Sequence, residues 1–349
     1  MADEEQIVTS VPEAHIVVAG VGGGGNNTIS RISRAGVQGI HLVAINTDAQ
    51  ALQTCPAGVT RLPIGVALTG GLGAGGRPDI GKQAAETSQH EIAEVLSGAD
   101  LVFVTAGMGG GTGTGAAPVV ARLAQEAGAL TVAFVTRPFR YEGPIKARHA
   151  QEGIEALRAN VDAVIVIPND RLLKIADPKM TLVEAFRKAD DILRQGIQGI
   201  TDIITIPGLI NVDFADIRAI LSQSGTALMA IGHGTGPRRC FDAAERAVRS
   251  ELLEVSIRGA QRALVNISGG SDLSLAEVSE AAEYIHSQVA ADAQIIFGAV
   301  LQDLPEDNVQ ITVIATLLPA ESVEPPSSTS APVNVSPRPT QVPSWLQPR

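Results

Sequence analysis

Nine residues at positions 107–115, with the sequence Gly-Met-Gly-Gly-Gly-Thr-Gly-Thr-Gly, have the composition of a loop that binds phosphate. They follow an apolar run at 101–106 that predicts a buried strand, and they precede a run with helical spacing. Glycine lets backbone N–H groups approach an anion closely, and the start of a helix favours negative charge. The loop contains no lysine, so it is not a P-loop of the Walker type. The alternative is a glycine-rich turn without a ligand.

A second glycine loop, at residues 20–27, follows a predicted strand at 15–19 and leads into a helix expected to end near Ala35. One such loop after a first strand is a moderate signal for a nucleotide-binding fold. Two in one domain are a stronger signal, because two backbone cradles can hold a diphosphate or a triphosphate.

Asp213 and Asp216 form the pattern Asp-x-x-Asp ahead of an apolar helical run that begins at Ile217. The structural interpretation is a helix cap with a second acid in the first turn. Capping would fix the direction of both carboxylates.

These residues must be positioned by strands that alternate with helices. Further strands are predicted at 41–45, 130–135 and 161–167, and Pro78 opens a helix that we expect to run to about Leu96. The alternation predicts βαβ units and a parallel sheet. The loops named above follow the carboxyl ends of strands, where open α/β sheets bind their ligands.

We therefore expect an α/β protein with a parallel-sheet nucleotide-binding domain, a long central helix, a smaller mixed α/β second domain and a disordered C-terminal tail. The expected boundaries are a disordered arm at 1–13, the nucleotide-binding domain at 14–180, the central helix at 181–205, the second domain at 206–318, a flexible linker at 319–337 and a docking peptide at 338–349.

The composition and charge of the chain limit the classes of protein to which it can belong. Hydrophobic residues make up 45% of the chain but aromatic residues only 3%, which predicts an aliphatic core of the kind found in covered parallel sheets. The net charge of −11 argues against a general nucleic-acid binder. No apolar run is long enough to span a bilayer, and we expect a reduced, cytoplasmic setting with no signal peptide. The six histidines and two cysteines form no ligand spacing, so no metal site is expected from protein side chains.

The end of the chain has a different composition. Eight of the 20 prolines lie in the last 31 residues, which is typical of a linker that cannot pack a core. The chain's single tryptophan, Trp345, stands there beside Pro343 and Leu346. Tryptophan is a common interface anchor, so we expect a short docking motif rather than a stray exposed side chain.

Together these motifs resemble the tubulin/FtsZ superfamily and, within it, bacterial FtsZ. The signature loop at 109–115, the loops at 20–27 and 71–75, and the segments 46–50 and 211–216 carry the resemblance, which extends over residues 14 to about 317 and includes the end of the tail. The resemblance implies a GTPase that polymerises head to tail into protofilaments and forms the division ring beneath the inner membrane. It also implies that the second domain is GTPase-activating.

The resemblance also implies roles for single residues. It places the GTP phosphates and the ribose against the following residues: Gly23, Gly24, Gly25, Asn26, Asn27, Ala74, Gly75, Gly111, Thr112, Gly113 and Glu142. It assigns the guanine base to Asn169, Phe186 and Asp190. Lys146 stands where the family usually has arginine, which keeps the charge but loses a bidentate fork, so we expect a weaker contact.

In the family, the acids matching Asp213 and Asp216 enter the nucleotide site of the next subunit and orient the attacking water. This implied role and the helix cap can hold together. The resemblance thus implies self-association into a homopolymer, Mg²⁺ held mainly by phosphates and water, and membrane adaptors that bind the C-terminal peptide. It implies no nucleic-acid partner and no direct insertion into a membrane.

Two alternatives remain open at this point. A nicotinamide-dependent oxidoreductase would need one glycine loop and an acid near the end of the next strand, a role for which Asp48 is available, but the second loop would then have no function. A GTP-binding filament protein that does not hydrolyse its nucleotide would not need the two acids.

Overall fold

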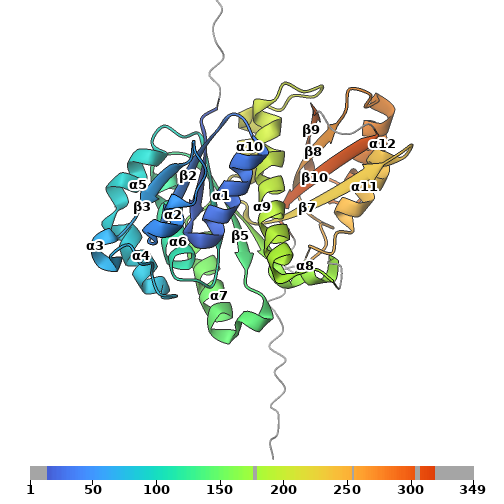
Figure 1. Cartoon of the computed structure of the whole chain (residues 1–349). Coiled ribbons are helices and arrows are strands. Elements are labelled where there is room, and N and C mark those ends of the chain that lie inside the picture. Colours follow the sequence, from blue (N-terminus) through green and yellow to red (C-terminus); the bar gives the residue numbers. More distant parts are fainter. Residues whose placement is uncertain (1–13, 176–178, 254, 303–306, 319–349) are drawn as a thin grey trace, which may run out of the picture.

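The computed structural model describes residues 14–175, 179–253, 255–302 and 307–318 (Figure 1). The expected arm at 1–13 and the expected linker and docking peptide at 319–349, with Pro343, Trp345 and Leu346, lie outside the described residues. Within the described part, no helix is long and apolar enough to cross a membrane.

In the described part of the chain, ten strands join into one sheet with the order β3-β2-β1-β4-β5-β6-β7-β10-β8-β9. The strands are β1 (Ile16–Val21), β2 (Ile40–Asn46), β3 (Thr60–Pro63), β4 (Leu101–Gly107), β5 (Leu130–Arg137), β6 (Ala163–Pro168), β7 (Gly225–Thr235), β8 (Arg262–Gly269), β9 (Gln294–Leu301) and β10 (Asn308–Thr316). β1 to β6 are parallel, and β7 continues them through only three residue pairs, beginning with Ala163 opposite Gly225. Beyond that short ladder, β7, β10 and β8 are antiparallel and β9 is parallel to β8.

Helices cover both faces of the parallel part of the sheet. The helices up to the start of β7 are α1 (Gly22–Ala35), α2 (Ala49–Gln53), α3 (Val66–Thr69), α4 (Pro78–Thr87), α5 (Gln89–Leu96), α6 (Thr112–Glu126), α7 (Pro144–Arg158), α8 (Asn169–Ile175), α9 (Leu182–Thr205) and α10 (Phe214–Leu221), with a short 3₁₀ turn, η1, at Arg140–Glu142. Alternate residues of β1 enter different cores, Val17 with α4 to α7 and Val18 with α1, α9 and α10. Every side chain of β1 is buried, as expected for a strand at the centre of a doubly covered parallel sheet.

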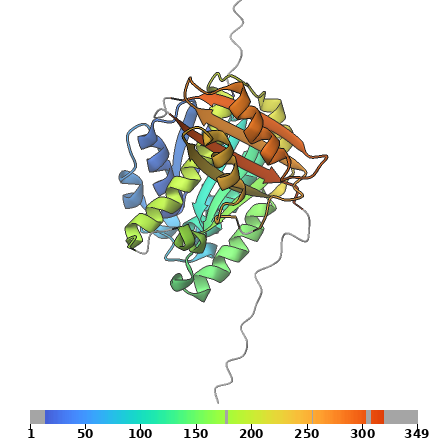
Figure 2. The same cartoon turned by 90° about the vertical axis from the view of Figure 1, so that its right-hand side faces the viewer.

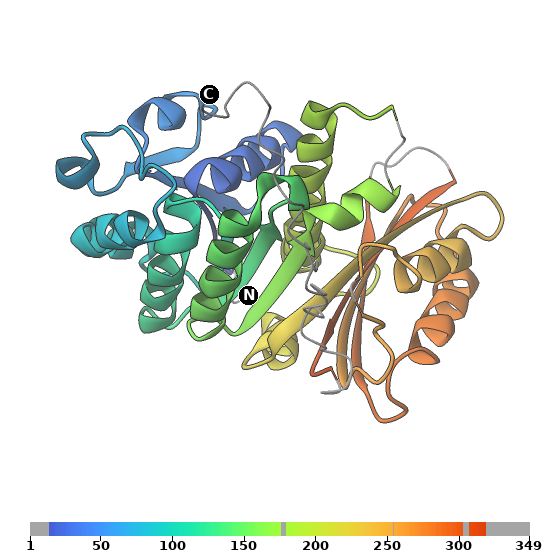
Figure 3. The same cartoon turned by 90° about the horizontal axis from the view of Figure 1, so that it is seen from below.

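Helix α9 separates the two parts of the molecule (Figures 1 and 3). It begins with a capping box in which Thr181 and Glu184 satisfy each other's backbone N–H groups. Its 24 residues make a rod about 36 Å long. One side of α9 belongs to the core of the parallel sheet through residues such as Ile197 and Ile200.

The second domain packs its sheet between α9 and two further helices, α11 (Arg239–Val248) and α12 (Leu275–His286) (Figure 2). Strands β10 and β8 of this sheet pack closely against α9. A Cβ added at Gly199 would lie 3.1 Å from Thr312 Cγ2, and Asn266 Nδ2 donates to Gly199 O at 3.0 Å. The two parts therefore share one rigid helix rather than a flexible linker.

The expected fold class is confirmed, two expected helix bounds are wrong, and several short elements were not expected. The helix expected from Pro78 to Leu96 is broken at Ser88, whose Oγ accepts a hydrogen bond from Gly65 N at 3.1 Å and whose φ is −113°. The helix after the signature loop begins at Thr112, so the last glycines of that loop already form helical turns. The short elements β3, α2, α3 and α8 have no clear periodic pattern and were not expected.

Candidate functional site: two glycine loops and the start of the central helix

Two long helices begin side by side where the central strands end. β1 and β4 pair in register from Ile16 opposite Leu101 to Val21 opposite Ala106, so α1 and α6 start at the same edge of the sheet. Neither helix has a side-chain cap, and neither has an acidic residue in its first turn. The free N–H groups and the positive ends of both helices are thus available to one anion.

Glycine is required here because the two loops touch through their backbones. A Cβ added at Gly22 would lie 2.7 Å from Gly113 N, and one added at Gly24 would lie 3.0 Å from Gly107 N. Gly22 also has a φ of +71°, which side chains rarely adopt. The packing merges the loops into one continuous lining of N–H groups.

A third loop closes the side of this lining. A Cβ added at Gly111 would lie 2.8 Å from both Ala74 Cβ and Arg77 N, so the segment that contains Ala74 and Gly75 rests on the signature loop. The hydroxyls of Thr47 and Thr112 lie 2.6 Å apart and join the end of β2 to the start of α6. The structure thus brings together the expected phosphate-binding residues of all three loops.

Asn26 has a buried side chain, 4% exposed, that bonds to the protein backbone. With its amide nitrogen turned toward the backbone, it donates to Gly20 O at 3.2 Å and to Ile45 O at 3.3 Å. Asn26 therefore ties the first loop to β1 and β2, whereas the side chain of Asn27 is exposed.

Glu142 and Lys146 form an ion pair at the mouth of the site. Lys146 Nζ donates to Glu142 Oε2 at 2.9 Å, while Phe139 N donates to Glu142 Oε1, also at 2.9 Å. A Cβ added at Gly109 would lie 2.9 Å from Lys146 O, which places this turn of α7 directly on the signature loop. In this structure the Lys146 charge is directed at Glu142.

The three residues expected to bind the base lie where β6 ends and α9 begins. Asn169 is the first residue of α8 and is 4% exposed, yet its Oδ1 has no hydrogen-bond partner. Phe186 is 40% exposed, and its ring packs edge-on against Phe139 with centroids 5.4 Å apart. An unpaired buried acceptor beside an exposed ring is a suitable surface for a flat, polar ligand.

Asp190, the third of these residues, is paired with Arg31 of α1, which the sequence analysis did not single out. Arg31 Nε lies 3.3 Å from Asp190 Oδ2. Burial raises the pKa of Asp190 to about 6, although the hydrogen bond and charge of Arg31 oppose that shift. No sequence signal identifies Arg31, because its role depends on the packing of α1 against α9.

Asp213 and Asp216 lie at the opposite end of the molecule from these loops. Both are at the start of α10, which follows the far end of α9, and both are exposed. Arg218 of α10 donates to Asp100 O at 3.4 Å, and Asp100 immediately precedes β4, whereas the signature loop follows β4. A seven-residue strand of about 23 Å thus separates the acids from their own chain's glycine loops.

The expectation that the Asp213 side chain caps its helix is wrong. Asp213 occupies the N-cap position with extended backbone angles, φ −69° and ψ 146°, but its side chain makes no cap hydrogen bond. Only its carbonyl joins the helix, by accepting from Asp216 N at 3.0 Å. The carboxylate is therefore not occupied by its own helix.

Comparisons with known proteins agree with this geometry. Residues 15–177 match the family described as "Tubulin/FtsZ family, GTPase domain", and residues 225–318 match "FtsZ family, C-terminal domain". The structure described as "FtsZ dimer, empty" from M. jannaschii is 44% identical to this chain, with a TM-score of 0.84 over 87% of this chain and 88% of that one. The chain belongs to the FtsZ family. It is accordingly a GTPase, and the nicotinamide-dependent alternative is set aside; Asp48, which that alternative needed, instead caps α2 by accepting from Gln50 N and Ala51 N.

Two further structures share the fold. A single-residue mutant of M. jannaschii FtsZ is also 44% identical, with a TM-score of 0.84 over 88% of this chain and 92% of that one. CetZ2 from Haloferax volcanii, described as a GTPγS-bound protofilament, is 23% identical, with a TM-score of 0.74 over 86% of this chain and 92% of that one.

Proposed function

We propose that this FtsZ-family GTPase assembles head to tail into protofilaments and hydrolyses GTP at sites that two successive subunits share. The observation that carries the proposal is the separation of Asp213 and Asp216 from the glycine loops of the same chain. A second copy in the same orientation brings its acid end to the nucleotide end of the first. Such a heterologous contact does not close on itself, so it propagates as a filament.

The phosphates bind at the starts of α1 and α6. The backbone N–H groups of Gly23, Gly24 and Gly25 and of Gly111, Thr112 and Gly113 supply donors from the two loops, and Ala74 and Gly75 border the terminal phosphate. The two uncapped helix ends support this assignment. Glu142, held by Lys146 and by the backbone of Phe139, accepts from the ribose hydroxyls.

The base is guanine because Asp190 is an acceptor when ionised. Guanine offers two adjacent donors, N1–H and the exocyclic amine, and a carboxylate can accept from both. Adenine would set a lone pair against Asp190, which costs about 1–3 kcal/mol. Phe186 stacks on the ring, and the unpaired Oδ1 of Asn169 takes a further donor.

Hydrolysis needs a group that orients water, and the acids of the neighbouring subunit provide it. The free carboxylate of Asp213 and the exposed carboxylate of Asp216 accept hydrogen bonds from the attacking water and direct its lone pair at the terminal phosphate. A single subunit keeps GTP bound without hydrolysing it, because its own acids are at the other end.

Exposed apolar side chains at both ends support the contact between subunits. Leu72 and Tyr141 lie beside the nucleotide loops and are 88% and 59% exposed. Leu209 and Ile210, just ahead of Asp213, are 59% and 40% exposed. Their burial between subunits would stabilise the filament by the hydrophobic effect.

Mg²⁺ would be held mainly by the phosphates and water. Among the described residues, no group of three or more histidine, cysteine, aspartate or glutamate side chains is placed to hold a metal ion. The ion would offset phosphate charge next to the acids of the neighbouring subunit.

We infer the cellular role from what the family implies. The protein works in the cytoplasm at the division site, in a ring beneath the inner membrane. Attachment is through adaptor proteins that bind Pro343, Trp345 and Leu346, and neither nucleic acid nor direct membrane insertion is involved.

The shared site is tested by mixing two inactive variants. Asp216→Ala keeps its nucleotide loops, and Asp190→Ala keeps its acids. By itself, neither variant should release phosphate from GTP. The turnover rate of Asp216→Ala should be lower than that of the parent by roughly 10²-fold or more. In an equal mixture, roughly a quarter of the interfaces combine intact loops with intact acids. Phosphate release should therefore return to roughly a quarter of the parent's rate. The double variant, Asp190→Ala with Asp216→Ala, is the control and should rescue neither single variant beyond background.

Two results would contradict the proposal. One is a mixture no more active than the sum of its parts while sedimentation shows co-assembly. The other is full turnover by Asp216→Ala and Asp213→Ala. Phosphate release also discriminates against a non-hydrolysing filament protein, which would assemble with GTP and release none.

A further inference from the structure

The hydroxyl of Thr47 lies inside the protein, just after the carboxyl end of β2 and next to the signature loop. Thr47 is 1% exposed. Its Oγ1 lies 2.6 Å from Thr112 Oγ1 at the start of α6. Among the described residues, Thr112 is the one hydrogen-bond partner of this hydroxyl. A buried hydroxyl that contacts a residue of the phosphate loops can influence how that residue binds.

The backbone around Thr47 is fixed on both sides, so its side chain has a set direction. Asp48 N donates to Asn46 Oδ1 at 3.2 Å. Thr47 O accepts from Gly73 N at 3.1 Å and from Thr69 Oγ1 at 3.3 Å. Threonine is also β-branched, which restricts rotation about χ1. The Thr47 hydroxyl is therefore held against the signature loop by the residues around it.

Thr112 lies where the two glycine loops meet. It is the first residue of α6, whose start has no side-chain cap, and it is half-buried. A Cβ added at Gly22 would lie 3.3 Å from Thr112 Cβ. The Thr112 side chain thus lies between the first glycine loop and Thr47, at the helix end that favours an anion.

The number of protons on the two hydroxyls decides their roles when phosphate is bound. A hydroxyl has one proton to donate and two lone pairs that can accept. Phosphate oxygens are strong acceptors, so the Thr112 hydroxyl must donate to one that binds there. The proton between the two threonines then comes from Thr47. Accepting this hydrogen bond also strengthens the donation by Thr112, because hydrogen bonds in a chain polarise one another.

We propose that Thr47 is a positioning residue of the nucleotide site: its hydroxyl donates to Thr112 Oγ1 and so holds the Thr112 hydroxyl as a donor to a phosphate oxygen. The inference rests on the proposed function, because it needs a phosphate at the starts of α1 and α6. Thr47 acts through Thr112 and supplies no direct contact with the nucleotide.

The Thr47 hydroxyl is tested with a variant of the same shape, Thr47→Val. Calorimetric titration of the full chain with GDP and with GTPγS, below the concentration at which it assembles, measures the affinity. Thr47→Val should bind at least one of the two nucleotides about fivefold more weakly. Thr47→Ser, which keeps the hydroxyl, should bind both as the parent does. An effect on GTPγS alone would assign the contact to the terminal phosphate.

A double-mutant cycle tests whether Thr47 acts through Thr112. Thr112→Val should weaken binding by about tenfold or more, because it removes a charge-assisted hydrogen bond. The double variant should bind like Thr112→Val within about twofold, because Thr47 then has no hydroxyl to hold. Independent roles would instead multiply the two losses to roughly fiftyfold.

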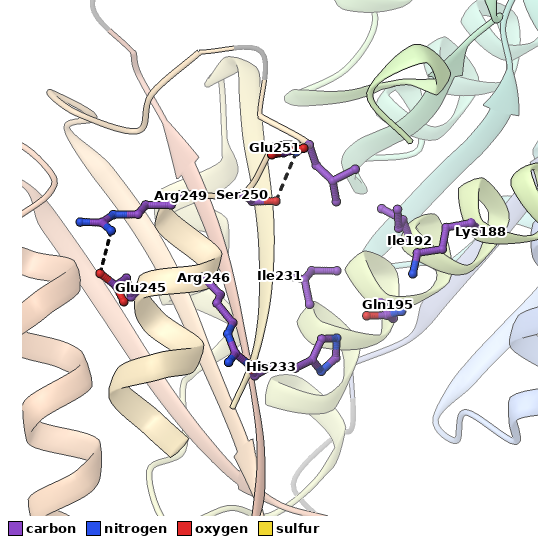
Figure 4. Close-up of a pocket in the computed structure, with 11 residues that line it drawn as sticks. Lys188, Ile192, Gln195, Ile231, His233, Glu245, Arg246, Arg249, Ser250 and Glu251 are labelled. Carbon is purple, nitrogen blue, oxygen red and sulfur yellow. Dashed lines mark hydrogen bonds and ion pairs between the residues drawn. The ribbon is translucent and has the colours of Figure 1, made fainter. Parts of the chain in front are cut away.

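Two controls remove hydroxyls elsewhere. Thr131→Val removes a buried hydroxyl that donates to Ala129 O at 3.1 Å, near the start of β5 and so at the opposite end of the sheet. Ser250→Ala removes a hydroxyl on the wall of a cavity of about 410 Å³ between α9 and the second domain (Figure 4). Both variants should bind nucleotide as the parent does. Circular dichroism shows whether each variant folds, and Thr47→Ala replaces Thr47→Val if the latter does not.

Two results would overturn this inference and leave the proposed function intact. One is a Thr47→Val variant that binds both nucleotides as the parent does. The other is a double variant whose loss of affinity is the product of the two single losses. If Thr112→Val binds both nucleotides as the parent does, the inference fails together with the proposed place of the phosphates.

Discussion

Arg31 Nε on α1 and Asp190 Oδ2 on α9 lie 3.3 Å apart and join the helix that starts at the first glycine loop to the helix that separates the two domains. The carboxylate is only 15% exposed, so it depends on this guanidinium to remain ionised. Without it, burial would raise the pKa of Asp190 further above its present value of about 6. The pair therefore ties the acid proposed to bind guanine to a single helix–helix contact.

The affinity for GDP should fall in acid. The proposed contact with guanine needs the ionised form of Asp190, so the affinity should fall roughly tenfold for each pH unit below the pKa of about 6. Arg31→Ala should shift this fall to higher pH and weaken binding already at pH 7.5, because the opposing charge is gone. Calorimetric titration with GDP from pH 4.5 to 8 measures both effects. Arg34→Ala, an exposed arginine on the same helix, should keep the parent profile, and an unchanged profile for Arg31→Ala would exclude this role.

Asp202 should make the protein less stable as the pH rises from 4 to 7. Burial raises its pKa to about 6 against an ordinary value of 3.8, although Gln302 Nε2 donates to its Oδ2 at 2.5 Å. The folded state thus binds a proton more readily than the unfolded state, so this contribution is complete below pH 3.8 and is lost as the pH rises through about 6. Asp202→Asn should raise the free energy of unfolding at pH 7.5 by about 1–3 kcal/mol and flatten its pH dependence.

Urea denaturation at pH 4.5 and pH 7.5 measures this change. Asp191→Asn is the control, for which the free energy of unfolding should change in the opposite direction. Burial alone would raise the pKa of Asp191, but hydrogen bonds from Arg194 and Gln195 hold it below its ordinary value. That variant should lose stability at pH 7.5. Equal destabilisation of both variants at pH 7.5 would contradict the interpretation of Asp202.

The close contact of the loops predicts different outcomes for two neighbouring glycines. Gly111→Ala forces a Cβ to within 2.8 Å of Ala74 Cβ and Arg77 N, whereas a Cβ at Gly110 meets nothing within 4 Å. Without nucleotide, Gly111→Ala should lower the free energy of unfolding by about 1–3 kcal/mol, and Gly110→Ala should leave it nearly unchanged. Thermal unfolding of the nucleotide-free proteins distinguishes them, and equal melting temperatures would show that the third loop does not rest on Gly111.

The sequence predicts those parts of this structure that depend on local patterns. The strands and long helices follow from apolar periodicity, and the two glycine loops follow from runs of glycine at strand ends. Arg31 could not be found in this way, because its significance arises only when α1 packs against α9. The cap expected at Asp213 failed for a related reason: its residue type suits a cap, but the chain path before α10 directs the carboxylate to solvent. The break at Ser88 likewise depends on Gly65, 23 residues earlier.

Variants of Lys146 test whether lysine, in place of the arginine usual in the family, lowers the affinity for GTP. Lysine is a point charge on a flexible stem, and here its ammonium is held by Glu142 Oε2 at 2.9 Å, so it serves the proposed ribose acid rather than reaching phosphate as a planar fork. Lys146→Arg should bind both Glu142 and a phosphate oxygen and so raise GTP affinity by a few fold, while Lys146→Ala should lower it about tenfold. Arg148→Ala, which changes a cation paired with Glu152 two residues further along α7, is the matched control and should bind GTP as the parent does. Equal affinity and turnover for the lysine, arginine and alanine forms would mean that this position has no part in nucleotide binding, and that Glu142 is positioned by the Phe139 backbone alone.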